Sequence, residues 1–254
     1  MEVTTHIEAL RHEGELLAVA TAATDPDAGV PTCPEWTVRD LVRHTGGVHR
    51  WATGYVAGGR TEAGDVVFED VAGPWPEDAA LAEWLRQGCA VLADALAAAP
   101  DELRCWSFLP APSPRAMWAR RQSHETAIHR VDAELAARTA LGPFGAAFAA
   151  DGVDELLTCF VPRRSSRLAS DTPASLSVQC SDTDAAWLLH IGPEGVTTST
   201  DQPTAGSGAD CSVRGAAADL YLALWNRAGP EGLVLEGDAD VLKLFLDTVH
   251  VRWS

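Results

Sequence analysis

A polar stripe between residues 121 and 132 constrains the fold of this chain more than any other feature. If the segment is helical, Glu125, His129 and Asp132 lie at positions i, i+4 and i+7 and share one face. A carboxylate and an imidazole at the edge of a core are costly to bury without a partner. A divalent metal ion is such a partner, because glutamate oxygen and histidine nitrogen are common zinc ligands. A third ligand must then come from elsewhere in the chain.

The neighbouring stripe of the same segment is apolar and would face a core: Ile128, Val131 and Leu135. The whole chain of 254 residues is long enough for one large domain or two smaller ones. Its composition, with 46% apolar and 22% charged residues, is typical of a globular protein. The net charge of −17 repels phosphate backbones and anionic lipids, and basic residues do not cluster, so we expect neither nucleic-acid nor membrane partners.

The chain carries no recognisable targeting or membrane segment. Residues 1–6 contain neither a basic nor an apolar stretch of the kind found in signal peptides, and no apolar run reaches 18 residues. The six cysteines form no C-x-x-C pair, which favours reduced, core-packing thiols. We therefore expect a cytoplasmic protein.

Four long segments of the first part of the chain are amphipathic at the helical period: 3–24, 37–57, 77–98 and 115–139. Thr37 and Asp40 form a capping pattern at the start of the second segment. This segment carries His44 on its apolar face, whereas His49 lies about 140° around the helix axis and cannot share that face. Four such helices with long connections predict a four-helix bundle, whose core can assemble a metal site from facing helices.

The pattern changes to short strand-like runs after residue 148. Strands are predicted at 176–180, 186–191, 195–200, 209–214 and 233–236, and helices at 149–161, 215–228 and 238–250. Strands and helices grouped in this way favour an α+β arrangement. We therefore predict an α+β two-domain protein, with a metal-binding four-helix bundle over residues 1–145 and a small α+β domain over residues 146–254.

The three groups expected to converge are His44, Glu125 and His129. Each lies on the inward side of its helix near mid-length. Three nitrogen and oxygen ligands on zinc leave a fourth position for water or substrate, which is the arrangement of a catalytic site. The spacing alone also fits a solvated or hydrogen-bonded pair, since any helix with Glu and His four residues apart shows it.

Four stretches of the sequence resemble one known family. Residues 33–44 (CPEWTVRDLVRH) with 47–51, 124–132 (HETAIHRVD), 213–227 and 235–238 are similar to motifs of the mycothiol-dependent maleylpyruvate isomerase family, which belongs to the DinB-like superfamily. The similarity extends over nearly the whole chain. The motifs are specific for the family and much less so for any one reaction.

The resemblance implies a DinB-like bundle that binds zinc or another divalent metal through His44, Glu125 and His129. It also implies a C-terminal module similar to sterol-carrier folds, and mycothiol, a low-molecular-weight thiol, as cofactor. Arg227 falls where the family has an arginine linked to substrate or thiol handling, so it is our candidate catalytic residue. From the sequence alone, Arg227 could equally be a surface residue near the end of a helix.

These features together predict a zinc-dependent, thiol-dependent enzyme that acts on a small electrophile as an isomerase or S-transferase, as a monomer or homodimer. Zinc favours the reactive thiolate form of a bound thiol. In an isomerase the thiolate could add to an alkene and later be eliminated, and in an S-transferase it could displace a leaving group or open an epoxide. One alternative is a non-catalytic zinc-bundle protein that binds or regulates and holds a small apolar ligand. Another is a metal-dependent hydrolase that uses metal-bound water. Ser165 and Ser166 lie outside any G-x-S-x-G motif, which argues against a serine hydrolase.

The sequence leaves two possible roles open for each of two carboxylates near the predicted ligands. Asp132 could orient a ligand or could simply lie on the helix surface, and the same holds for Asp40 one turn before His44.

Overall fold

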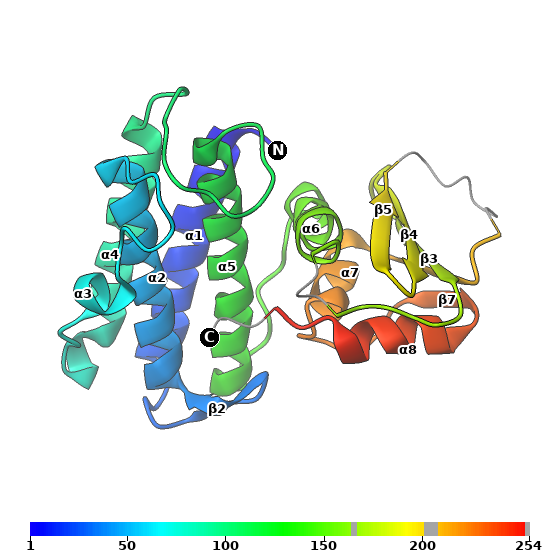
Figure 1. Cartoon of the computed structure of the whole chain (residues 1–254). Helices are drawn as coiled ribbons and strands as arrows, with labels where there is room; N and C mark the ends of the chain where they lie inside the picture. Colours follow the sequence, from blue (N-terminus) through cyan, green and yellow to red (C-terminus); the bar gives the residue numbers. More distant parts are fainter. Residues whose placement is uncertain (164–166, 201–207, 252–254) are drawn as a thin grey trace. The chain divides into compact units, whose positions relative to one another are not determined.

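The computed structural model of the chain describes residues 1–163, 167–200 and 208–251. The chain is divided into two compact units, Met1–Gly142 and Pro143–Ser254. The first unit is a bundle of helices, and the second contains a sheet with helices (Figure 1). The α+β fold class with an N-terminal helical region is confirmed. Ser165 and Ser166 lie outside the described residues.

Four long helices form the first unit. They are α1 (Val3–Ala22), α2 (Val38–Gly58), α4 (Leu81–Ala98) and α5 (Pro114–Ala137). Helix α1 packs against α5 and α4, and helix α2 packs against α4 and α5. The packing brings α2 and α5, which carry the predicted ligands, into direct contact.

Helices α2 and α5 begin at strong local signals. The Thr37 backbone N–H donates to Asp40 Oδ2 at 2.9 Å and the Asp40 N–H donates to Thr37 Oγ1, so the predicted capping box is formed at the start of α2. Ser113 caps α5, and Pro114 occupies its first turn, where no N–H donor is needed. These caps fix the first residue of each helix and therefore the face on which each later side chain lies.

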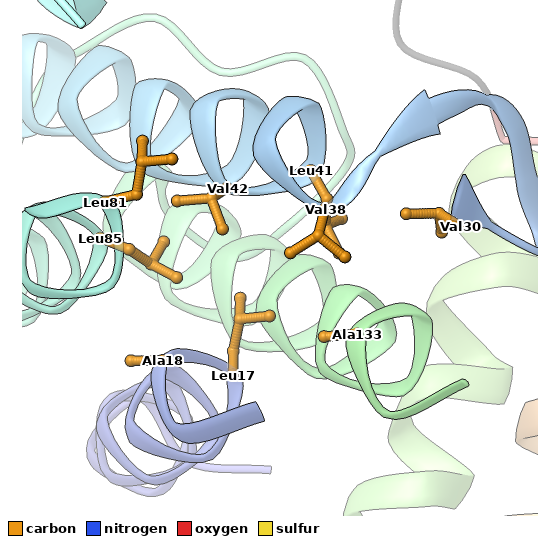
Figure 2. Close-up of a cluster of buried hydrophobic side chains, with 9 residues drawn as sticks. All are labelled: Leu17, Ala18, Val30, Val38, Leu41, Val42, Leu81, Leu85 and Ala133. Carbon is orange, nitrogen blue, oxygen red and sulfur yellow. The ribbon is translucent and has the colours of Figure 1, made fainter. Parts of the chain in front are cut away.

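The core at one end of the bundle is aliphatic (Figure 2). It is built from Leu17, Ala18, Val30, Val38, Leu41, Val42, Leu81, Leu85 and Ala133. Burying each leucine contributes roughly 1.5–3 kcal/mol relative to exposure. Helices α2 and α4 also approach closely at Gly46, where a Cβ atom would lie only 2.1 Å from the Trp84 ring. A residue without a side chain is therefore required at this crossing.

Shorter elements fill the connections of the first unit. The antiparallel hairpin of β1 (Gly29–Val30) and β2 (Cys33–Thr37) precedes α2, in a stretch for which the sequence predicts only an extended chain. Helix α3 (Phe68–Ala72) lies in a stretch predicted to be a loop, because five residues are too few to show a helical period. The third predicted helix starts as a 3₁₀ turn, η1 (Asp78–Ala80).

The second unit is built on one five-stranded sheet. Its strands are β3 (Ala174–Cys180), β4 (Ala186–Gly192), β5 (Gly195–Ser199), β6 (Cys211–Gly215) and β7 (Val234–Gly237), in the order β5-β4-β3-β6-β7. Among the strands that the structure describes, only the β3–β6 pair is parallel, with Val178 opposite Val213. Alternate residues of β4 and β6 are buried, as one apolar sheet face requires, whereas three consecutive residues of the central strand β3, 176–178, are fully buried.

The helices of this unit are α6 (Ala146–Asp154), α7 (Ala217–Leu224) and α8 (Ala239–Thr248), and α6 continues as a π-helical turn, η2 (Glu155–Phe160). Helix α7 ends at Leu224, although the sequence predicts a helix to residue 228, because Asn226 adopts a left-handed conformation with φ of 59°. Arg227 consequently lies beyond the helix. Among the described residues, no helix has the length and apolar character needed to cross a bilayer.

Candidate metal centre

Helices α2 and α5 bring the three predicted ligands together. One donor atom from each of His44, Glu125 and His129 lies within 4.8 Å of the other two. His44 Nε2 is 3.3 Å and His129 Nε2 is 3.2 Å from the same carboxylate oxygen, Glu125 Oε1. The two imidazole rings meet edge to face, with centroids 5.1 Å apart. All three donors therefore point toward one small volume.

The distances among these donors fit a shared ion. Two ligands bound tetrahedrally to zinc at about 2.0–2.1 Å lie about 3.3–3.4 Å from each other. The observed 3.2 and 3.3 Å contacts fall close to that separation and at or beyond the long end of the usual hydrogen-bond range. Two imidazole nitrogens and one carboxylate oxygen are also a chemically suitable set for zinc. The residues present therefore fit a divalent metal ion.

Glu125 is oriented by an arginine one helical turn earlier. Arg121 Nη2 donates to Glu125 Oε2 at 3.0 Å, and both side chains are almost fully buried. The second oxygen, Oε1, thereby faces the imidazoles. Burial raises the pKa of the Glu125 carboxyl, but hydrogen bonds from His129 and His44 and the charge of Arg121 outweigh it and hold the pKa well below its usual range. Glu125 is therefore ionised, which is the form in which a carboxyl group binds a metal ion.

His129 is held from its other side by Asp132. His129 Nδ1 donates to Asp132 Oδ2 at 2.9 Å, and the Asp132 side chain is fully buried. Thr32 Oγ1 donates to the second oxygen of Asp132 at 2.5 Å. A carboxylate that accepts the Nδ1 proton of a histidine fixes its tautomer and ring orientation. Of the two interpretations that the sequence leaves open for Asp132, the orienting one agrees with these contacts.

The two histidines have different electrostatic surroundings. Burial lowers the pKa of His44, even though its hydrogen bond to Glu125 opposes this. Burial would also lower the pKa of His129, but its hydrogen bonds to Asp132 and Glu125 raise the pKa to about 9. Without a metal ion, His129 is therefore the imidazole that holds a proton, and it must release that proton to bind an ion through Nε2.

Trp36 is a neighbour of the site, and the sequence favours a role for it in the core or in a pocket wall. Its ring in β2 lies 4.7 Å from the His44 ring and 5.9 Å from the His129 ring, centroid to centroid. The sequence signals were its place eight positions before a candidate ligand and inside the stretch 33–44 that resembles the family. Thr32 gave no signal, because its partner Asp132 is 100 residues away in the chain.

Other candidate residues lie elsewhere. His49 is fully buried, with Nε2 2.8 Å from Thr126 Oγ1, and it does not join the group formed by His44. Asp40 caps helix α2. Arg227 belongs to the second unit, where its Nη1 donates to the Trp225 carbonyl at 2.8 Å. Its predicted role in substrate handling stays a prediction.

The fold and the site together define a class of protein. In this class a helical bundle, with side chains that could bind a metal ion, is joined to an α+β unit. Sequence models of the two domains of one family match this chain: the mycothiol maleylpyruvate isomerase N-terminal domain at residues 7–134 and the C-terminal domain at residues 147–244. The chain belongs to the mycothiol maleylpyruvate isomerase family. The resemblance inferred from the sequence and the assignment to a family of enzymes are confirmed.

Two similar solved structures are those of the mycothiol-dependent maleylpyruvate isomerase and of a histidine-to-alanine variant of it. Each is 14% identical to this chain, and each match covers 94% of this chain and 95% of the solved one. The TM-score is 0.62 for the unmodified protein and 0.65 for the variant. At this identity the likeness shows a shared fold. No curated protein matches the chain.

Proposed function

We propose that this protein is a thiol-dependent enzyme that binds a divalent metal ion, zinc in the first instance, through His44, Glu125 and His129. Its thiol would be mycothiol, and its substrate a small electrophile that is isomerised or joined to the thiol. The observation that carries the proposal is the convergence of two imidazole nitrogens on one carboxylate oxygen at 3.2 and 3.3 Å. Membership of a family named for a mycothiol-using isomerase supports the thiol part.

Three protein ligands suit a catalytic rather than a structural zinc site, because a fourth position stays available. When bound, the ion would lower the pKa of a coordinated thiol and keep it as the nucleophilic thiolate near neutral pH. His44 forms the more exposed side of the group, with 15% of its side chain accessible against 4% for Glu125. The small molecule would therefore approach from the side of His44.

The charges around the donors favour an anionic thiol. Glu125 and Asp132 contribute one negative charge each and Arg121 contributes one positive charge, which leaves a net charge of minus one for these three side chains when the imidazoles are neutral. A divalent cation changes this sum to plus one. A single thiolate then balances it, which is electrostatically favourable in a buried site.

Arg227 is proposed to bind a carboxylate of the substrate. The guanidinium group is always cationic and can pair with a carboxylate through two parallel hydrogen bonds. The support for this role is the family resemblance of the surrounding sequence, 213–227. An Arg227→Lys variant, which keeps the charge but loses the planar fork, should raise KM for a carboxylate substrate more than it lowers kcat.

Further parts of the proposal are a cytoplasmic location, a monomeric or homodimeric state and a domain boundary between residues 145 and 146. All six cysteines are free thiols, which is typical of proteins that work in a reducing compartment.

The test combines metal analysis with a thiol-dependent assay. Purified wild-type protein should contain about one divalent ion per chain, and should isomerise or conjugate electrophilic alkenes only when mycothiol is present. His129→Ala should lose the ion and the turnover, whereas His12→Ala, which changes an exposed histidine of α1, should keep both.

The other outcomes separate the alternatives. Stoichiometric metal without any turnover would favour a binding or regulatory protein. Turnover that needs no thiol would favour a metal-dependent hydrolase. A wild-type protein without stoichiometric metal, or a His129→Ala variant with full metal content, would overturn the proposal.

A further inference from the structure

We propose that the β1–β2 hairpin is a positioning clamp for the metal centre, in which Thr32 acts through Asp132 on His129 and Trp36 acts directly on both imidazole rings. This inference rests on the proposed function, because it assumes that His44 and His129 bind a metal ion. The hairpin would decide how tightly and in what geometry the ion is held. None of its residues would itself be a ligand.

The first arm of the clamp is a chain of two hydrogen bonds. Thr32 Oγ1 donates to Asp132 Oδ1 at 2.5 Å, and His129 Nδ1 donates to Asp132 Oδ2 at 2.9 Å. Because Nδ1 carries the proton in this arrangement, the lone pair of the neutral ring is on Nε2, which is the atom that faces Glu125 and His44. Thr32 holds the carboxylate in the rotamer that His129 needs.

The position of Thr32 follows from the register of the hairpin. Val30 is paired with Cys33, so Pro31 and Thr32 form a two-residue loop at the tip. Proline fixes φ at the first of these positions, which limits the conformations that the tip can adopt. The Thr32 hydroxyl is thereby presented to a side chain on α5 that is 100 residues further along the chain.

The second arm of the clamp is the Trp36 ring. It lies 4.7 Å from the His44 ring at an angle of 45°, and 5.9 Å from the His129 ring at an angle of 34°. One indole therefore packs against both imidazoles and limits the rotation of each. An apolar ring in this position also excludes water from one side of the donors, which strengthens electrostatic interactions there.

The hairpin can act as a clamp because the core holds its base. Val30 is 1% exposed and belongs to the same apolar cluster as Leu41 of α2 and Ala133 of α5 (Figure 2). Backbone N–H groups of Val38 and Arg39 donate to carbonyls of residues 28 and 26, each at 2.9 Å. A hairpin tied to the core and to the start of α2 moves with the helices that carry the ligands.

The test measures metal affinity and the geometry of the bound ion rather than turnover. Zinc affinity is determined by competition with a chromogenic chelator, and geometry by the visible absorption of the cobalt-substituted protein. The variants are Thr32→Val, which replaces the hydroxyl by a methyl group, Asp132→Asn and Trp36→Leu. Thr24→Val is the matched control, because it removes a threonine hydroxyl that donates to the Ala20 carbonyl in α1.

We expect Asp132→Asn to weaken zinc binding by about 10- to 100-fold and Thr32→Val by about tenfold, as is usual when a group that orients a metal ligand is removed. Trp36→Leu should change the position and intensity of the cobalt bands. Thr32→Ser restores the hydroxyl and should restore affinity, and Thr24→Val should match the wild-type protein. A merely structural role of Thr32 would lower the free energy of unfolding of the metal-free protein without changing the cobalt spectrum.

The failure of this inference is distinguishable from the failure of the proposed function. If the wild-type protein binds zinc and all the hairpin variants bind it equally well with unchanged cobalt spectra, the clamp is wrong and the metal site stands. If the wild-type protein itself binds neither zinc nor cobalt, both proposals are wrong.

Discussion

Helix α5 carries two buried polar clusters, one around His129 and one around Arg130. The two residues are neighbours in the chain, but the groups that surround them differ. Arg130 is fully buried and donates from Nε to Glu13 at 2.6 Å and from Nη1 to both oxygens of Glu134 at 2.8 Å. His129, one residue earlier, faces Glu125, Asp132 and His44 instead. Each cluster contains two carboxylates, Glu125 and Asp132 in one and Glu13 and Glu134 in the other. The number of carboxylates therefore does not distinguish the clusters.

The nitrogen groups that face the carboxylates make the difference. A guanidinium brings five N–H donors and a permanent charge but no acceptor, so Arg130 gives its two carboxylates one positive charge and directed hydrogen bonds. In the other cluster the Nε2 atoms of two imidazoles face one anionic oxygen. Such a nitrogen can donate to the oxygen while it is protonated and can bind a cation once it has lost its proton. Both clusters therefore contain a buried arginine, but the one in which imidazole nitrogens converge on a carboxylate oxygen also offers a ligand set to an external cation. A buried polar group therefore indicates a ligand site when its acceptors converge.

Replacing Glu125 by Gln should have the largest effect, since it removes the anionic ligand and leaves a poorly basic amide oxygen. We expect zinc affinity to fall at least about a thousand-fold, or about 4 kcal/mol. Competition with a chelator measures the change, and circular dichroism checks that the variant is folded. A Gln variant that binds zinc within tenfold of the wild-type protein would contradict the assignment of Glu125 as a ligand.

Replacing Arg130 by Met should break the cluster around this residue, because two buried carboxylates lose their cation. Loss of one partner from a buried ion cluster typically costs about 3–5 kcal/mol of stability. Denaturant titration measures the loss. Zinc affinity of the remaining folded protein should stay close to that of the wild-type protein, and a large loss of zinc binding would show that the two clusters are not separate.

Changing the pH should affect the metal-free and metal-loaded proteins differently. In the folded metal-free protein the pKa of His129 is about 9, above its ordinary value of 6.5, because hydrogen bonds to Asp132 and Glu125 outweigh the effect of burial. The stability from this proton is fully present below pH 6.5 and is lost as the pH rises through 9. We expect the metal-free protein to lose about 3 kcal/mol over this range.

The metal-loaded protein should show no such loss, because an ion on Nε2 replaces the proton. Denaturant titrations at pH 6.5 and pH 9, with and without a chelator, measure the difference. The metal-free His129→Gln variant is the control and should lack the dependence. Equal pH profiles for the two wild-type forms would argue against metal binding at His129.

Replacing Glu134 by Gln should have the smallest effect on stability and on zinc binding. This variant is the matched control for Glu125→Gln, since it makes the same change in the other cluster. The amide oxygen can still accept from Arg130, and Glu13 still supplies a negative charge to it. We expect a change in the free energy of unfolding of about 1 kcal/mol or less, and unchanged zinc binding. A loss as large as that of Arg130→Met would mean that the second carboxylate is as necessary as the first.

The sequence predicted the fold class and the helices of the bundle because amphipathic periodicity depends only on local spacing. Glu125 and His129 were predicted to share a face for the same reason, as their four-residue separation fixes their relation within one helix. Placing His44 opposite them required the packing of α2 on α5, which spacing alone does not give. In that step the prediction rested on the inward position of each side chain in the expected bundle, and the family resemblance supported it.

The hairpin could not be predicted in the same way. Strand β1 has only two residues, and Pro31 and Pro34 interrupt any alternating pattern. Its contacts are non-local, since Thr32 meets a residue 100 positions away. In the second unit, α7 was predicted to extend four residues too far, because a left-handed Asn226 is not visible in the apolar period.

His44 and Glu125 are 81 residues apart in the chain and belong to different helices. An ion shared between them would hold α2 to α5 in the folded state and would be released on unfolding, because the unfolded chain does not present both ligands together. Folding and metal supply would then be coupled by mass action. A cell short of the metal would lose this protein through proteolysis of its opened bundle as well as through loss of its catalytic ion.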